Sequence, residues 1–161
     1  MISHLRLGAV VAGGCLGSLL SMTSASASAP TQFRFTEPVS ITDASSCSFP
    51  ISINLQVTLV GRVFYDAQGN FQSVTIQQDT LGTDSANGIS LREDDHWVDF
   101  IDSLGADKEV GVPIHVQGAS GLVIRDAGLI QFNPDGSVVY LRGPHPSLEG
   151  ENAAVCAALT P

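Results

Sequence analysis

The stretch ISINLQVTL (residues 51–59) alternates apolar and polar side chains without a break. A period of two places all its apolar residues on one face of an extended strand, whereas a helix would scatter them around its circumference. The stretch VGVPIHVQ (residues 110–117) repeats the alternation. Pro113 within it has no amide hydrogen, which predicts a sheet edge or a bulge at that position. Both stretches predict β-strands.

Shorter runs rich in β-branched and aromatic residues fill most of the remaining chain, which gives about ten predicted strands in all. The shorter runs are residues 32–36, 39–41, 63–65, 71–77, 88–91, 96–101, 122–125, 129–132 and 138–141. The turns predicted at residues 66–70, 126–128 and 133–136 are too short for a parallel crossover, so neighbouring strands are expected to be antiparallel. We expect an all-β antiparallel meander of short strands that closes as a barrel, with a two-sheet sandwich as the alternative. Longer polar loops are predicted at residues 80–87, 103–107 and 143–152.

Composition limits the classes of function. The chain of 161 residues has 7 basic and 16 acidic side chains, a formal charge of -9. An acidic chain lacks the basic surface that neutralises phosphates, so nucleic acid and anionic membranes are not expected as partners. Apolar residues make up 43% of the chain and charged residues only 14%. This balance excludes an intrinsically disordered chain and predicts one folded domain.

Residues 1–27 have the pattern of a secretory signal peptide. A weakly cationic start with His4 and Arg6 precedes an apolar run over residues 7–20, and Ala25-Ser26-Ala27 supplies a small-residue cleavage motif. The run is shorter than the roughly 20 residues that a bilayer requires. We therefore expect residues 28–161 to form a single secreted β-domain that is extracellular and not bound to a membrane. Removing residues 1–27 takes away one Arg and no acid, so the formal charge becomes -10.

Two of the three cysteines, Cys47 and Cys156, remain after the predicted cleavage. In an oxidising compartment a single pair of cysteines favours one intramolecular disulfide. Two free buried thiols or a pair of metal ligands are the alternatives.

Several further motifs occur together with these cysteines. They are Cys47-Ser48-Phe49-Pro50 before a strand, Gly61, an Asp-x-x-Gly turn at residues 66–69, and Asn133-Pro134-Asp135-Gly136. With the terminal Cys156-Ala157-Ala158-Leu159, this combination resembles small secreted β-proteins of actinobacteria. The resemblance covers most of residues 45–161 and consists mainly of turn glycines and the cysteine pair. It implies a compact β-domain with an end-to-end disulfide, and it supplies no catalytic residue.

The densest polar cluster is EDDHWVDFID (residues 93–102), which holds five carboxylates. Ca²⁺ binds six to eight oxygen ligands and is the one cofactor that this cluster could attract, but the spacing matches no calcium-binding loop. On a strand, contiguous carboxylates alternate between the two faces and do not converge. The cluster is therefore interpreted mainly as a polar turn that leads into a strand, and no cofactor is expected.

Four residues are candidates for ligand binding. Trp97 is the only tryptophan and could stack on a sugar ring, with Asp99 binding hydroxyl groups, although a lone Trp is more often a packing residue. His96 and His115 are the other two candidates. The His spacing in this chain matches no local metal motif, so no metal site is expected.

Three functions are compatible with these features. The favoured one is a secreted, non-catalytic binding or interaction module that recognises a small ligand, a glycan or a partner protein. The second is an extracellular enzyme with a site around His96, Asp99 and His115, although no nucleophile motif or phosphate-binding loop is present. The third is a secreted inhibitor or toxin component that presents residues 80–87 or 143–152.

Overall fold

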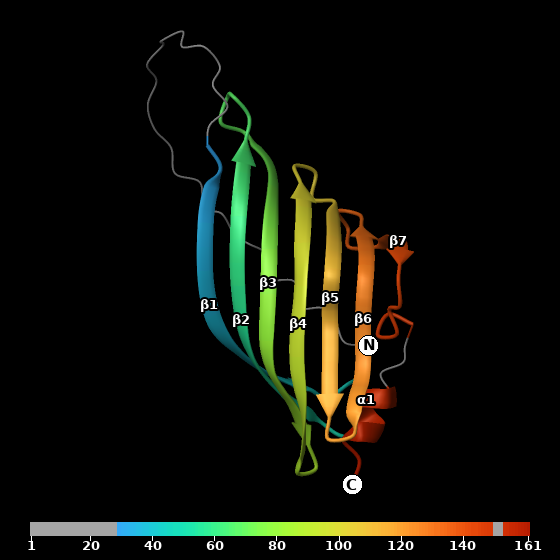
Figure 1. Ribbon diagram of the computed structural model, residues 1–161. Coiled ribbons are helices and arrows are strands. Elements are labelled where there is room, and N and C mark those ends of the chain that lie inside the picture. The colour runs from blue at the N-terminus through green and yellow to red at the C-terminus, as the bar shows by residue number, and fades with distance from the viewer. Residues whose placement is uncertain (1–28, 150–152) are drawn as a thin grey trace.

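The computed structural model describes residues 29–149 and 153–161, and the predicted signal peptide therefore lies outside the described residues. These residues form one antiparallel sheet in which seven strands follow one another in chain order, with a short helix at the C-terminal end (Figure 1). The elements are β1 (Thr31–Asp43), β2 (Ile51–Tyr65), β3 (Phe71–Ala86), β4 (Ile89–Asp102), β5 (Asp107–Gly118), β6 (Gly121–Phe132), β7 (Val138–Arg142) and α1 (Ala153–Ala158). Within the described ranges, no helix has the length and apolar content needed to cross a membrane.

The all-β antiparallel meander predicted from the sequence is confirmed, but the prediction of about ten short strands is wrong. Several pairs of predicted strands are single long strands, and β3 reaches 16 residues. Residues 126–128, predicted as a turn, lie inside β6, and residues 80–86, predicted as a loop, belong to β3. Polar residues were interpreted as turn or loop signals at these places, whereas they lie within continuous strands and alternate between the two faces.

Bulges explain how such long strands tolerate polar and glycine-containing segments. The register between β4 and β5 shifts between Glu93 and His96, and the register between β5 and β6 shifts between Gly111 and Ile114. Pro113 lies in the second of these bulges, as its missing amide hydrogen predicted. Gly111 has a φ of 141°, and a Cβ there would come within 3.0 Å of the Cβ of Trp97, so this position requires glycine.

The sheet does not close into a barrel and does not split into a sandwich, so both architectures predicted from the sequence are wrong. All seven strands belong to one sheet, whose edges are β1 and β7. Closure would require the first and last strands to pair. β7 has only five residues, against 13 in β1, and it pairs with the last part of β6 alone. Pro38 removes an amide hydrogen from the middle of β1, which is typical of a protected edge strand.

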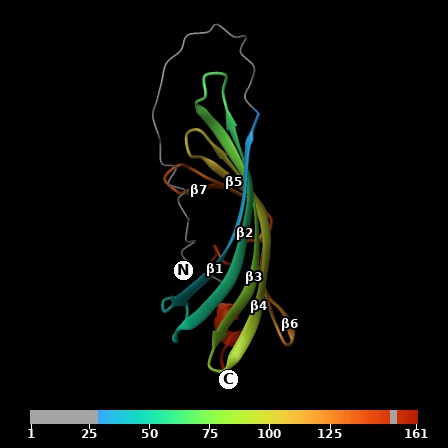
Figure 2. The same ribbon diagram turned by 90° about the vertical axis from the view of Figure 1, so that its left-hand side faces the viewer.

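The two faces of the sheet differ, and the face that packs against α1 is called the inner face here. It carries the odd-numbered residues of β1, β2 and β4 and the even-numbered residues of β3 and β6, as the strand registers show. Figure 2 shows that β1 and β2, at their ends nearest α1, bend toward the side of the sheet on which the helix lies. The opposite side is called the outer face.

The hydrophobic core lies at one end of the inner face, where α1 packs on the sheet. Leu159 is fully buried, and Val155 is 5% exposed. Burying a Leu or Val side chain stabilises by roughly 1.5 to 3 kcal/mol. The buried cluster consists of Ile51, Ile53, Leu91, Val116, Ile124, Val155 and Leu159. Five strand residues and two C-terminal residues thus form the main core at the α1 end of the sheet, while Ile130 and Phe132 of β6 are buried outside this cluster.

A disulfide joins Cys47, in the β1–β2 connection, to Cys156 in α1. The Cα atoms are 5.5 Å apart, a usual distance for such a bond. The connection begins with a tight turn, because Asp43 accepts hydrogen bonds from the backbone amides of Ser45 and Ser46 at 2.8 and 3.1 Å. The predicted pairing is confirmed, and it ties a helix of only six residues, too short to be stable alone, to the start of the sheet.

Replacing both Cys47 and Cys156 with Ser is expected to destabilise the fold without changing its strand content. The bond spans 109 residues, and on the chain-entropy model a loop of this size contributes about 4 to 5 kcal/mol. Thermal unfolding followed by circular dichroism, with and without reductant, measures the effect. Reductant should lower the melting temperature of the native protein and leave the double variant unchanged. Identical melting curves for all samples would contradict the stabilising role.

Candidate functional site

The part of the inner face farthest from α1 carries large apolar side chains that do not belong to the buried cluster. Cross-strand registers place Phe35, Leu59, Gln78 and Trp97 in one row across β1 to β4. The next row along the strands contains Phe33, Gly61, Ile76 and Asp99. The third contains Val63, Val74 and Ile101. We call the apolar residues of these rows, Phe33, Phe35, Leu59, Val63, Val74, Ile76, Trp97 and Ile101, the distal inner surface.

Most side chains of the distal inner surface are partly exposed, and Phe35 is 42% exposed. Phe33 and Phe35 stack with ring centroids 6.0 Å apart. The Phe33 ring lies over Gly61, where an added Cβ would collide with it. The sequence therefore places a glycine at the position where an aromatic ring from the edge strand folds flat onto the sheet. The result is a broad, shallow apolar surface at the β1 side of the inner face.

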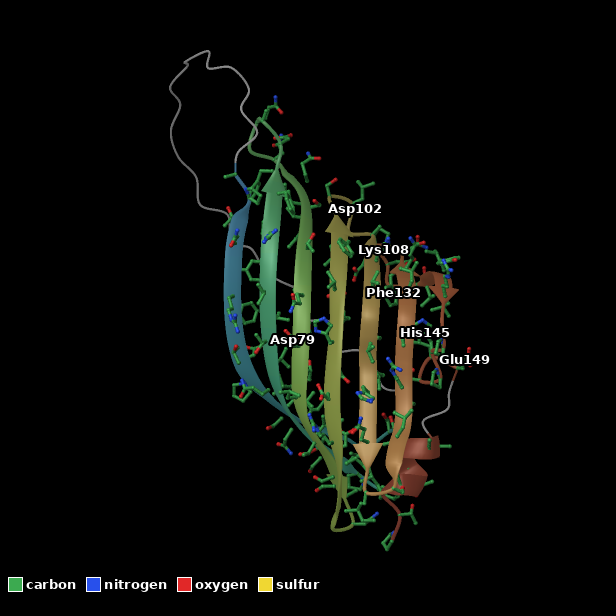
Figure 3. The ribbon with its side chains drawn as sticks, viewed as in Figure 1. Asp79, Asp102, Lys108, Phe132, His145 and Glu149 are labelled. Atoms are coloured by element: carbon green, nitrogen blue, oxygen red, sulfur yellow. A yellow bond between two sulfur atoms is a disulfide. The ribbon has the colours of Figure 1, made fainter. Side chains whose placement is uncertain are left out.

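Charges are segregated between the two faces. All six Lys and Arg residues of the described ranges lie on the outer face, while nine carboxylate residues of the strands lie on the inner face. The cations are Arg34, Arg62, Arg92, Lys108, Arg125 and Arg142, and Figure 3 labels Lys108 on β5. The inner-face acids are Glu37, Asp43, Asp84, Glu93, Asp95, Asp99, Asp107, Glu109 and Asp126. The inner face is therefore both apolar and strongly acidic.

Three of these acids form a buried carboxyl cluster between the core and the distal inner surface. Asp84 on β3 is 6% exposed and Asp95 on β4 is 4% exposed. Glu93 lies between them and is hydrogen-bonded to both carboxyl groups. The backbone amide of His115 donates a hydrogen bond of 2.7 Å to Asp95. A hydrogen bond between two carboxyl groups requires a proton on one of them, so this cluster holds protons in the folded protein.

The pKa values of the cluster follow from this environment. Burial, together with the charge of Glu93, raises the pKa of Asp84 to about 8. Burial and the adjacent Asp95 raise the pKa of Glu93 to about 8. Burial also raises the pKa of Asp95, to about 7, although hydrogen bonds from Glu93 and from the His115 amide oppose the rise. The protons of the three groups are shared, so they titrate as a coupled set.

The structure separates the four ligand-binding residues predicted from the sequence. Trp97 and Asp99 share the inner face, and the indole Nε1 donates a hydrogen bond of 3.2 Å to Asp99 Oδ2. His96 and His115 project from the outer face, where His96 Nδ1 contacts Asp79 and His115 Nε2 accepts a bond of 2.9 Å from the Gln117 amide. Because His96 and Asp99 lie on opposite faces of the sheet, they form no hydrogen-bonded catalytic pair.

Two further buried polar residues, Asp126 and His145, lie where the segment after β7 runs back along β6. Asp126 on β6 is 1% exposed and accepts hydrogen bonds from the backbone amide and the hydroxyl group of Ser147. His145, labelled in Figure 3, is 2% exposed on the same segment. Its Nε2 is 3.3 Å from the carbonyl oxygen of Arg142. These contacts fix the chain that leads to α1, so we interpret Asp126 and His145 as structural residues.

No group of three or more His, Cys, Asp and Glu side chains within the part of the chain that the structure describes is arranged to hold a metal ion.

Sequence reasoning did not identify Asp84 and Glu93 as partners. The alternation along β4 did indicate that these acids lie on the apolar face, because Glu93 and Asp95 are odd-numbered like Leu91 and Trp97. The pairing with Asp84 depends on the register of β3 with β4, which only the structure supplies.

Comparison of the chain with protein-family models, with curated proteins and with solved structures finds no match.

The carboxyl cluster predicts that stability falls as pH rises. The folded-state pKa values of about 7 to 8 exceed the unfolded values of 3.8 and 4.5, so the folded cluster binds more protons than the unfolded chain between these limits. The stabilising contribution is therefore complete below about pH 4 and is lost as pH rises toward about 8. We expect the free energy of unfolding in urea to decrease between pH 5.5 and 8.5 by at least about 1.4 kcal/mol, the equivalent of one pKa unit.

A matched pair of variants tests the assignment. Asp84→Asn with Glu93→Gln removes the shared protons and should flatten this pH dependence, whereas Asp102→Asn, at an exposed outer-face position on β4 far from the cluster, should leave it unchanged. An unfolding free energy in the native protein that is constant or increases over this range would contradict the protonated cluster.

Proposed function

We propose that this protein is a secreted, non-catalytic binding module that holds a partner on its distal inner surface. Secretion is supported by the signal-peptide pattern of residues 1–27 and by the Cys47–Cys156 disulfide. The resemblance to small secreted actinobacterial β-proteins is part of the same proposal. The observation that carries the binding function is the division of the inner face, in which the apolar side chains of β1 to β4 far from α1 lie outside the buried cluster and are partly exposed.

An apolar surface of this kind has a physical cost. A sheet normally buries at least one face against another layer, because exposed apolar area is unfavourable in water. Here Phe35 and several neighbours remain partly exposed in an ordered, cross-strand arrangement. Contiguous exposed apolar patches on folded domains commonly mark binding sites. Docking of a partner would remove this area from water and supply the second layer.

The shape of the surface favours a segment of a larger molecule. The row from Phe35 to Trp97 crosses four strands, which corresponds to about 14 Å at the usual strand spacing. Small molecules are normally held in enclosed pockets that bury most of their surface. A flat, apolar sheet face offers little enclosure but a large contact area. We therefore favour a protein partner over a glycan or small ligand.

Site-specific photo-crosslinking tests this proposal. A benzoylphenylalanine residue placed at Phe35 should crosslink the partner in the culture medium or cell envelope of the producing organism. The same residue at Thr36, which is exposed on the outer face of the same strand, is the matched control. We expect a defined adduct from position 35 and at least about tenfold less of it from position 36. Equal labelling at both positions, or no adduct from position 35, would contradict a partner on the distal inner surface.

A further inference from the structure

We propose that the part of the outer face farthest from α1 binds an anionic polysaccharide, whose charged groups pair with Arg62, Lys108 and Arg142. This inference goes beyond the proposed function, because the distal inner surface lies on the opposite face of the sheet. It is carried by exposed cations that form no ion pair, by exposed apolar side chains among them, and by the spacing of these groups across the strands.

Two adjacent cross-strand rows of the outer face hold four of the six described cations. The first row runs from Arg62 on β2 through Lys108 on β5 to Tyr140 on β7. The second row runs from Arg34 on β1 to Arg142 on β7. All four cations are exposed, and the residues that the registers assign to the two rows include no Asp or Glu. These rows therefore form a positively charged surface on an acidic chain.

The acids that flank the two rows along the strands are already engaged. They are Asp79 and Asp102, both labelled in Figure 3. Asp79 contacts His96 and interacts electrostatically with Arg34. Asp102 accepts hydrogen bonds of 2.8 and 3.0 Å from backbone amides of the turn that follows β4.

The other three cations of the rows, Arg62, Lys108 and Arg142, form no ion pair within the described residues, where Arg92 is the one Lys or Arg that does. Lys108 Nζ lies over the Phe100 ring at 5.8 Å from its centre, a cation–π contact that does not use its N–H donors. The charged groups of all three are therefore available to an anionic ligand.

Exposed apolar side chains lie in the same two rows. Phe100 is 46% exposed, Tyr140 is 47% exposed and Val110 is 39% exposed. Aromatic side chains combine a large apolar surface with a fixed shape, which suits them to pack against the apolar face of a sugar ring. Gln131 lies between Lys108 and Tyr140 in the first row, and its amide can both donate to and accept from a hydroxyl group. The rows therefore offer contacts for sugar rings as well as for charges.

The separation of the cations favours a ligand with widely spaced anionic groups. At the usual strand spacing, the three intervals from Arg62 to Lys108 measure about 14 Å, and the two from Lys108 to the strand of Arg142 about 10 Å. Duplex DNA carries one charge for about every 1.7 Å of its axis, a density that these cations do not match. An acidic peptide lying across the side chains would leave much of its backbone without hydrogen-bond partners. In a polysaccharide, whole sugar units separate the charges and no backbone amide needs a partner.

The test uses two charged oligosaccharides long enough to cross the sheet, an oligogalacturonate and a sulfated dextran. Fully methyl-esterified oligogalacturonate and plain dextran are the matched uncharged forms, and an oligoglutamate with as many carboxylates is the acidic-peptide comparison. Isothermal titration calorimetry at low ionic strength measures binding, because salt screens exposed charges. We expect at least one charged oligosaccharide to bind saturably, and its uncharged form and the oligoglutamate to bind at least about tenfold more weakly.

Matched variants distinguish the two rows from the other cations of the outer face. Arg62→Gln with Lys108→Gln should weaken binding of the charged oligosaccharide at least about tenfold. Arg92→Gln with Arg125→Gln removes the same charge from exposed outer-face positions outside the rows and should have a much smaller effect. Circular dichroism confirms that each variant is folded before its affinity is compared.

A second pair of variants tests the apolar contacts. Tyr140→Ala should weaken binding, whereas Leu81→Ala, at an exposed outer-face position outside the rows, should not. Phe35→Ala on the inner face should also leave polysaccharide binding unchanged, so this site and the proposed function are tested independently.

The inference is overturned if neither charged oligosaccharide binds, if charged and uncharged forms bind equally, or if both double variants weaken binding equally. Oligoglutamate that binds as tightly as the charged oligosaccharides would also overturn it, in favour of an acidic protein as the occupant of the outer face. None of these outcomes affects a partner crosslinked at Phe35.

Discussion

The packing of α1 on one end of the sheet is the constraint on which the rest of the structure depends. A seven-stranded meander has local connections but no second layer, and its apolar face must be covered somewhere for the domain to be stable. α1 has only six residues, so its contribution depends on Val155, on the adjacent Leu159 and on the bond from Cys156 to Cys47. This arrangement concentrates the core at one end. It leaves the apolar side chains of β1 to β4 that lie farther from α1 outside the buried cluster.

Strand alternation then determines what each part of the inner face contains. Because the side-chain period is two, long strands carry one set of residues from the core through the carboxyl cluster to the distal inner surface. Along β4, Leu91 is in the core, Glu93 and Asp95 are in the cluster, and Trp97 and Asp99 are distal. One strand thus positions three environments in sequence. Bulges at the β4–β5 and β5–β6 pairings keep this face continuous where the register shifts.

The sequence predicted the parts of the fold that depend on local patterns, namely the strand alternation, the antiparallel meander, the bulge at Pro113 and the Cys47–Cys156 pairing. It did not predict strand length, because carboxylates and glycines inside strands have the same local signature as turns. Closure was also beyond local reasoning, since it depends on whether a five-residue β7 could meet β1. For the site, Trp97 and Asp99 are on the same face as predicted by their spacing. Their separation from His96 follows from the same alternation and excludes a catalytic pair.

The positions of the inner-face acids show how the sheet tolerates so many carboxyl groups on one face. Inward-pointing charges can protect a sheet from edge-to-edge association. Such protection is needed at the edges, where Pro38 already interrupts β1 and where β7 is short. Most of the acids, however, lie on the central strands β3 to β5, away from both edges. Near α1 they are buried and share protons. Farther from α1, Asp99 pairs across the sheet with Glu109, whose neighbour on β6 is the fully buried Ile130. Edge protection therefore does not account for acids on the central strands, whereas proton sharing explains how those near α1 are tolerated in the interior of the sheet face.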